Sequence, residues 1–130
     1  MTEQLSESIR VLVVTDQDTV RNALRYGFPD DFEVAFVIDS REALRSLPEI
    51  APSVVVVDLQ TGSAGGYGLA RDMSEDARWA HVPIVMLLER EQDMWLARQA
   101  GARVAVTKPV AAGRLINDIR ALVDGAATSS

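Results

Sequence analysis

The sequence contains no cysteine, one histidine and one lysine. Without cysteine the chain can form no disulfide, no zinc–thiolate site and no thiol nucleophile. His81 is the single histidine, which excludes a cluster of imidazole metal ligands. Thirteen basic residues against nineteen acidic residues give a net charge of −6. This charge argues against direct nucleic-acid binding, which requires a basic surface to displace counterions from phosphates.

Long hydrophobic runs are also absent. No stretch approaches the roughly 18 consecutive apolar residues that a membrane-spanning helix needs. The polar, acidic first eight residues do not resemble a signal peptide. With 130 residues, the chain is long enough for one hydrophobic core and too short for two. We therefore expect one cytoplasmic domain, residues 9–124, with flexible tails at 1–8 and 125–130.

Short runs rich in β-branched residues alternate with segments in which apolar residues recur at helical spacing. The five runs are 9–15, 32–38, 54–57, 84–88 and 103–107. The third is all valine, which is typical of a strand covered on both faces. Asp18 stands where it could cap the first helix, and Gly101 where it could end the fourth. Five β-then-α units predict an α/β domain, a parallel five-stranded sheet with helices on both faces. We take its strand order, 2-1-3-4-5, from the flavodoxin-like doubly wound folds.

Three of the expected strands end in a charged residue: Asp16 after the first, Asp58 after the third and Lys108 after the fifth. In the order 2-1-3-4-5 the first and third strands are neighbours, so two carboxylates should converge with an ammonium group. Such a site suits Mg²⁺ and phosphoryl transfer to a carboxylate. The alternative is that these are ordinary turn, cap and surface residues. Because Lys108 is the only lysine beside twelve arginines, a specific need for its side chain is favoured.

The order and spacing of several motifs resemble the receiver domain of bacterial two-component response regulators, from about residue 9 to 123. The motifs are Val-Val-Thr15-Asp16, Val-Val-Val-Val-Asp58, His81-Val-Pro-Ile-Val-Met86, Ala100-Gly101-Ala102 and Thr107-Lys108-Pro109. The resemblance implies that Asp58 is the phosphoacceptor and that Lys108 contacts the phosphoryl group, with a cis bond to Pro109. It also implies a Mg²⁺ ion held by Asp16, Asp58 and the backbone carbonyl of Gln60.

Three positions depart from the family pattern. Thr15 stands where the family has a second acidic residue, so the Mg²⁺ site should be weakened. Leu88 replaces the serine or threonine whose hydroxyl follows the phosphoryl group, and Ala105 replaces the aromatic switch residue. The glycine-rich segment 61–66 is expected to be a mobile loop, since glycine places few limits on the backbone angles. It could suggest a phosphate cradle, but it lacks the Gly-Lys-Ser/Thr ending of a P-loop. The sequence therefore predicts an atypical receiver.

Met94 and Trp95 are expected on the fourth helix, whose predicted buried stripe is Leu96, Ala97 and Ala100. Trp95 should project away from that stripe. It could be partly buried against a loop, or it could serve as a hot spot for a protein partner on the face formed by the fourth helix, fifth strand and fifth helix.

Three functions remain open from the sequence. The first is a stand-alone receiver, not an enzyme beyond self-phosphorylation, that takes phosphate from a histidine kinase or phosphotransfer protein and acts through a protein partner. The second is a pseudo-receiver adaptor whose contacts do not depend on phosphate. The third is a small flavodoxin-like enzyme or flavin carrier. It is disfavoured because Asp16-Gln17-Asp18 follows the first strand, where that class needs a phosphate-binding loop.

Overall fold

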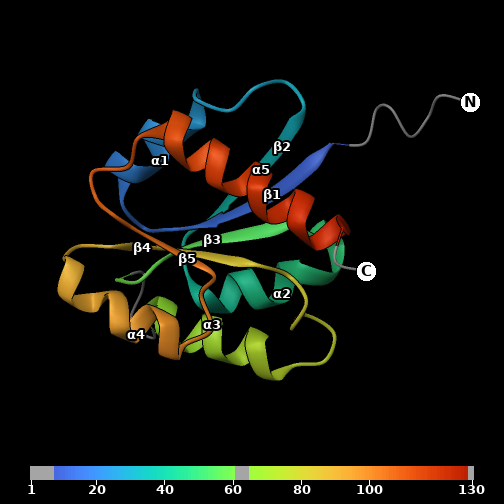
Figure 1. The fold of residues 1–130 in the computed structure, drawn as a ribbon, viewed down its shortest axis with the longest axis vertical. Helices are drawn as coiled ribbons and strands as arrows, with labels where there is room; N and C mark the ends of the chain where they lie inside the picture. The colour runs from blue at the N-terminus through green and yellow to red at the C-terminus, as the bar shows by residue number, and fades with distance from the viewer. Residues whose placement is uncertain (1–7, 61–64, 129–130) are drawn as a thin grey trace, which may run out of the picture.

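Five parallel strands form the middle layer of the computed structural model, which describes residues 8–60 and 65–128 (Figure 1). They are β1 (Ile9–Val14), β2 (Phe32–Val37), β3 (Val54–Asp58), β4 (Ile84–Leu88) and β5 (Val104–Thr107). Their order is β2-β1-β3-β4-β5, and every neighbouring pair is parallel. The predicted flavodoxin-like α/β fold is confirmed, and each strand lies within one residue of its predicted bounds.

Helices cover both faces of the sheet (Figure 1). They are α1 (Asp18–Arg25), α2 (Ser40–Ile50), α3 (Gly65–Glu75), α4 (Met94–Gln99) and α5 (Ala112–Thr128), with a 3₁₀ turn, η2 (Glu91–Asp93), leading into α4. Helices α1 and α5 pack on one face, and α2, α3 and α4 pack on the other. The sheet therefore separates two hydrophobic clusters.

Alternation along the strands divides the apolar side chains between these clusters. In β1, Leu12 and Val14 join the cluster beneath α2, α3 and α4, whereas Val11 and Val13 join the one beneath α1 and α5. The four valines of β3 are fully buried, as expected for a central strand covered on both faces. The strand ends that carry polar residues are thereby fixed on a rigid frame.

Helix α1 begins differently from the prediction. Gln17 is its N-cap residue and makes no side-chain capping bond, and Asp18 is the first helical residue. The Asp18 carboxylate instead pairs with Arg21 one turn along the helix. The Gln17 N–H donates to the hydroxyl of Thr15 at 3.1 Å. The side chain that binds the backbone at the start of α1 is thus Thr15, not Asp18.

The glycine-rich segment predicted as a mobile loop divides into two parts. Residues 61–64 lie outside the described residues. Gly65 and Gly66 are the first residues of α3, so that part of the prediction is wrong. The Gly66 N–H donates to the Leu59 carbonyl at 3.0 Å, and a Cβ at Gly66 would collide with the Asp58 carbonyl oxygen. Glycine is needed here because α3 starts directly against the end of β3.

The two ends of the chain depart in part from the predicted tails. Helix α5 continues to Thr128, four residues into the segment expected to be frayed. Residues 1–7 lie outside the described residues. Within 8–60 and 65–128, no helix combines the length and the apolar character that crossing a membrane requires.

Candidate functional site

The carboxyl ends of four neighbouring strands meet at one edge of the sheet. Thr15 directly follows β1, Asp58 ends β3, Glu89 follows β4 and Lys108 follows β5. The register explains why they meet, since Asp58 pairs with Leu87 and Leu88 pairs with Thr107. In open parallel sheets this edge is where ligands bind.

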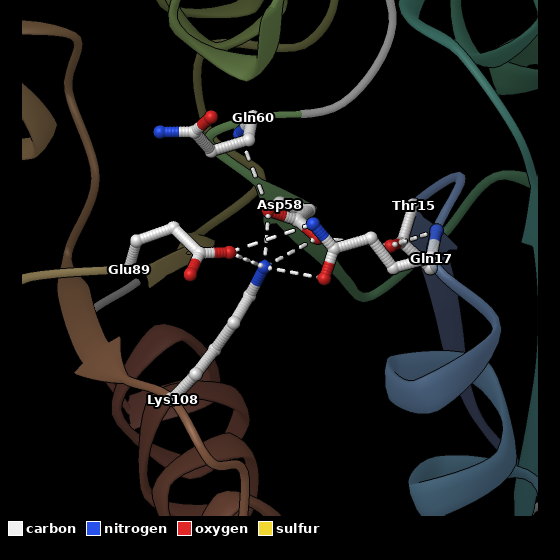
Figure 2. Close-up of polar contacts among 6 residues, drawn as sticks. All are labelled: Thr15, Gln17, Asp58, Gln60, Glu89 and Lys108. Carbon is white, nitrogen blue, oxygen red and sulfur yellow. Dashed lines mark hydrogen bonds and ion pairs between the residues drawn. The ribbon is translucent and has the colours of Figure 1, made fainter.

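Asp58 is fully buried, and its carboxylate is surrounded by donors (Figure 2). Oδ2 accepts from the Thr15 hydroxyl at 2.9 Å and from Lys108 Nζ at 2.9 Å. Oδ1 accepts from Lys108 Nζ at 2.9 Å and from the Gln60 N–H at 3.2 Å. A carboxylate offers about four lone-pair positions, so protein donors occupy its whole capacity. This satisfies the condition for burying a charge, a paired and fully hydrogen-bonded group.

Lys108 lies at the centre of the site (Figure 2). Its side chain is only 12% exposed, and Nζ also contacts Gln17 Oε1 at 2.9 Å and Glu89 Oε2 at 2.8 Å. The ammonium group therefore has three N–H donors for four acceptor atoms. The predicted convergence of Asp58 with Lys108 is present. We call Thr15, Gln17, Asp58, Gln60, Glu89 and Lys108 the polar network.

Glu89 and Gln17 are site residues that the sequence patterns did not reveal. The Gln17 amide nitrogen lies 3.4 Å from Glu89 Oε2, so the two side chains bridge the space in front of Lys108. The hydrogen bond and positive charge of Lys108, with the Gln17 amide, lower the pKa of Glu89 below its ordinary value. A signal was present for Glu89, because it is the first residue beyond the fourth strand, as Lys108 is beyond the fifth.

The proposed Mg²⁺ ligands are only partly assembled. Asp16 is exposed beside Thr15, and Gln60 reaches Asp58 through its backbone N–H. Within the described parts of the chain, no three His, Cys, Asp or Glu residues form a metal cluster. The oxygen donors are nevertheless of the kind that Mg²⁺ prefers, and the ion is commonly held by one or two carboxylates with water completing its shell. Asp16, Asp58 and the Gln60 carbonyl thus fit a weakly held ion.

The two positions that lack the family's switch residues are apolar in their surroundings. Leu88 is fully buried in the cluster beneath α2, α3 and α4, and Ala105 packs partly buried against the same cluster. Leu88 contacts the site through its backbone, where its carbonyl accepts from the Lys108 N–H at 2.8 Å. The predicted cis peptide bond between Lys108 and Pro109 is present.

A hollow of about 410 Å³ opens beside the polar network, between α1 and the segment after β5. Gln17, Glu89 and Lys108 form its polar wall. Val20 and Val110 contribute apolar lining. Lys108 therefore lines the hollow, whereas Asp58 does not.

Helix α4 presents a different face from the one predicted. Trp95 is 66% exposed, as expected, but Leu96 is 39% exposed and not part of the buried stripe. Asp93, Ala97 and Ala100 are the buried positions, and Met94 packs partly buried against the core. The buried face is therefore rotated from the expected one, and Leu96 joins Trp95 on the outside.

A family model described as the response regulator receiver domain matches residues 11–120. The chain belongs to this receiver domain family. Receiver domains are signalling modules of two-component systems rather than enzymes, interact with histidine kinases and typically bind Mg²⁺. This supports the receiver interpretation over the flavodoxin-like enzyme.

The relatives that match the chain include proteins about twice its length and a protein of similar length. Transcriptional regulatory protein CseB of Streptomyces avermitilis is 30% identical over 122 residues, which cover 92% of this chain and 51% of CseB. The chain spans about half the length of the first curated relatives that it matches. Protein PilG of Pseudomonas aeruginosa is 25% identical, and the match covers 93% of this chain and 92% of PilG.

Solved structures agree on the fold. Chemotaxis response regulator CheY4 of Vibrio cholerae superimposes with a TM-score of 0.80 at 21% identity, covering 88% of this receiver domain and 98% of CheY4. At that identity the likeness concerns the fold alone.

Proposed function

We propose that this receiver domain accepts a phosphoryl group on Asp58 from a histidine kinase or phosphotransfer protein and passes the signal on by protein–protein contact. The observation that carries the proposal is the contact of Lys108 Nζ with both oxygens of the buried Asp58 carboxylate, at 2.9 Å each. A carboxylate at a strand end beside a fixed ammonium is suited to phosphoryl transfer, because the ammonium can offset the added negative charge.

The transfer would be a displacement at phosphorus. One carboxylate oxygen of Asp58 forms a bond to phosphorus, while the bond between phosphorus and the donor's leaving atom breaks and its electron pair leaves with the donor. The product is an acyl phosphate on Asp58. Lys108 Nζ is placed to donate to a phosphoryl oxygen while it stays beside Asp58, and the Gln60 N–H remains available to Asp58 Oδ1.

In this proposal Asp16, Asp58 and the Gln60 carbonyl would hold Mg²⁺. When bound, the ion supplies charge shielding between the carboxylates and a phosphoryl group. Thr15 contributes a neutral hydroxyl, which donates to Asp58 at 2.9 Å instead of offering another carboxylate. Binding of Mg²⁺ should therefore be weak and should depend on both aspartates.

The test is the intact mass of the protein after incubation with acetyl phosphate, with and without Mg²⁺. We expect one phosphoryl adduct that requires Mg²⁺ and is absent from Asp58→Asn. Circular dichroism of the variant checks that it is folded. An adduct that persists in folded Asp58→Asn would refute the assignment of Asp58.

A second candidate function is a phosphorylation-independent adaptor. It is favoured by the apolar surroundings of Leu88 and Ala105, which provide no hydroxyl or aromatic ring to report a phosphoryl group. The two functions differ in partner binding. Equal affinity of a partner for unmodified and phosphorylated protein supports the adaptor, whereas an affinity that changes with the adduct supports the phosphate-dependent receiver.

The output surface in this proposal is the face that α4 forms with β5 and α5, including Met94 and Trp95. Trp95 supports it because it is 66% exposed next to the exposed Leu96, and tryptophan is enriched among the hot spots of protein interfaces. The net charge of −6 supports a protein partner rather than direct contact with nucleic acid. We further propose a cytoplasmic location, which is usual for receiver domains.

A further inference from the structure

Glu89 belongs to the polar network, but the proposed transfer gives it no role. Its Oε2 lies 2.8 Å from Lys108 Nζ, and its side chain is 42% exposed whereas that of Lys108 is 12% exposed. Among the acceptors of the lysine, Glu89 is exposed, Gln17 is half-buried and Asp58 is fully buried, so Glu89 is the outermost. We propose that Glu89 is a positioning residue that holds the side chains of Lys108 and Gln17 in place. It must release Lys108 before a phosphoryl oxygen can bind to the ammonium group. This inference rests on the proposed function.

The donor count makes release necessary. The ammonium group has three N–H donors, and four acceptor atoms already share them: both oxygens of Asp58, Gln17 Oε1 and Glu89 Oε2. An incoming phosphoryl oxygen must replace one of these acceptors. Asp58 is fully buried and would lose its charge partner without gaining water, whereas Glu89 is rehydrated on release. Glu89 is therefore the acceptor that gives way.

Charge acts in the same direction. Asp58 and Glu89 carry two negative charges, and Lys108 supplies one positive charge between them. A phosphoryl donor that enters the adjoining hollow brings further negative charge toward the Glu89 carboxylate, which forms part of the hollow's wall. Removing the charge of Glu89 should therefore favour any anion that approaches Lys108.

The experiment uses the fact that Lys108 is the only lysine in the chain. Protein made with lysine that is isotopically labelled at Nζ gives one side-chain NMR signal. That signal reports directly on Lys108. The probe is inorganic phosphate, titrated against wild type, Glu89→Gln and Glu91→Gln. Glu91 is the matched control because it is an exposed glutamate two residues along the chain, in η2 and outside the polar network.

We expect Glu89→Gln to bind phosphate about three- to fivefold more tightly than wild type, the range of a partly exposed ion pair. The initial rate of adduct formation from acetyl phosphate should rise by a similar factor. Glu91→Gln should match wild type in both measurements. Equal phosphate affinity of wild type and Glu89→Gln, or an equal gain in Glu91→Gln, would overturn the inference.

The two proposals fail in different ways. If no variant forms an adduct but Glu89→Gln binds phosphate more tightly at Lys108, the proposed function fails and the control of anion access by Glu89 stands. If wild type and Glu89→Gln form adducts at the same rate and bind phosphate equally, the function stands and the role of Glu89 fails.

Discussion

Thr15 changes the character of the site by supplying a neutral donor to a buried carboxylate. Its hydroxyl lies 2.9 Å from Asp58 Oδ2, and its oxygen also accepts from the Gln17 N–H at 3.1 Å. A carboxylate at this position would instead place a second negative charge beside Asp58, whose own charge is paired with Lys108. Thr15 therefore suits a resting state in which protein donors alone satisfy Asp58.

The substitution Thr15→Asp tests this balance. Without Mg²⁺ it should lower the free energy of unfolding by about 3 kcal/mol, because it buries a charge without a partner. Added Mg²⁺ should recover much of the loss in urea denaturation, because two adjacent carboxylates bind the ion more strongly. Thr15→Val, which removes only the hydrogen bond, should cost about 1–2 kcal/mol and show no recovery. Recovery in both variants would contradict the argument.

Glu89 gives a prediction for pH dependence. Lys108 lowers the pKa of Glu89 below 4.5, its ordinary value, through a hydrogen bond and through its charge. Because the folded pKa lies below the unfolded one, this pair stabilises the fold above about pH 4.5 and loses that contribution as the pH falls through the folded pKa. Thermal unfolding of Glu89→Gln should show a shallower loss of stability below that pH than wild type. Parallel curves for the two proteins would contradict the pairing.

Among the elements, α3 is tied most closely to the site. Gly66 lies in its first turn, against the carbonyl oxygen of Asp58 and the side chain of Val57. This contact sets where the chain turns after the end of β3, and so helps to fix the backbone that carries Asp58 and Gln60. Gly68, two residues further along the helix, faces open space, because no neighbouring atom lies within 4 Å of where its Cβ would be.

The two glycines make a matched pair of substitutions. Gly66→Ala should lower the free energy of unfolding by about 2–3 kcal/mol, because the added methyl group overlaps backbone atoms. Gly68→Ala should raise it by about 0.5–1 kcal/mol, since alanine favours the helix and meets open space. Urea denaturation of both variants provides the measurement. A stable Gly66→Ala protein would show that α3 can start elsewhere.

Strands were predictable from the sequence because strands that are buried on both faces consist of apolar, β-branched residues. The all-valine run of β3 identifies a strand covered on both faces, and the charged residues that follow it and β5 mark the site edge. Asp58 and Lys108 could thus be found without coordinates. Their contact required the strand order, which was taken from a known fold rather than from the residues.

Other features depend on packing that the sequence does not reveal. The hydrophobicity of Leu96 predicts a core residue. In the structure a 3₁₀ turn precedes α4, and Asp93 is buried whereas Leu96 is exposed. Glycines suggest mobility, yet Gly66 is fixed by a close backbone contact. Glu89 could have been found by applying to the fourth strand the rule used for the fifth.

At the scale of the whole molecule, the site and the α4 surface are joined through β4, β5 and the core between them. Leu88 ends β4 in that core, and Ala105, which pairs with Met86 across β4 and β5, packs against the same core. Neither side chain has a polar atom that could form or break a hydrogen bond when Asp58 changes. A surface that includes Trp95 is therefore weakly linked to events at Asp58 through these two residues, which is what the second candidate function, the phosphorylation-independent adaptor, requires.

The last prediction follows from this weak link. Trp95→Ala should reduce the affinity of a purified output partner by about thirtyfold, the effect of losing an aromatic hot spot of about 2 kcal/mol. Its free energy of unfolding should change by less than about 0.5 kcal/mol, because the side chain is mostly solvent-exposed. Asp58→Asn should reduce partner affinity much less, because Leu88 and Ala105 provide no polar relay between the two places. Isothermal titration calorimetry on the three proteins measures each affinity directly. Equal binding by wild type and Trp95→Ala would remove this face from the output surface, and a larger loss in Asp58→Asn would mean that a relay exists without the hydroxyl and the aromatic ring.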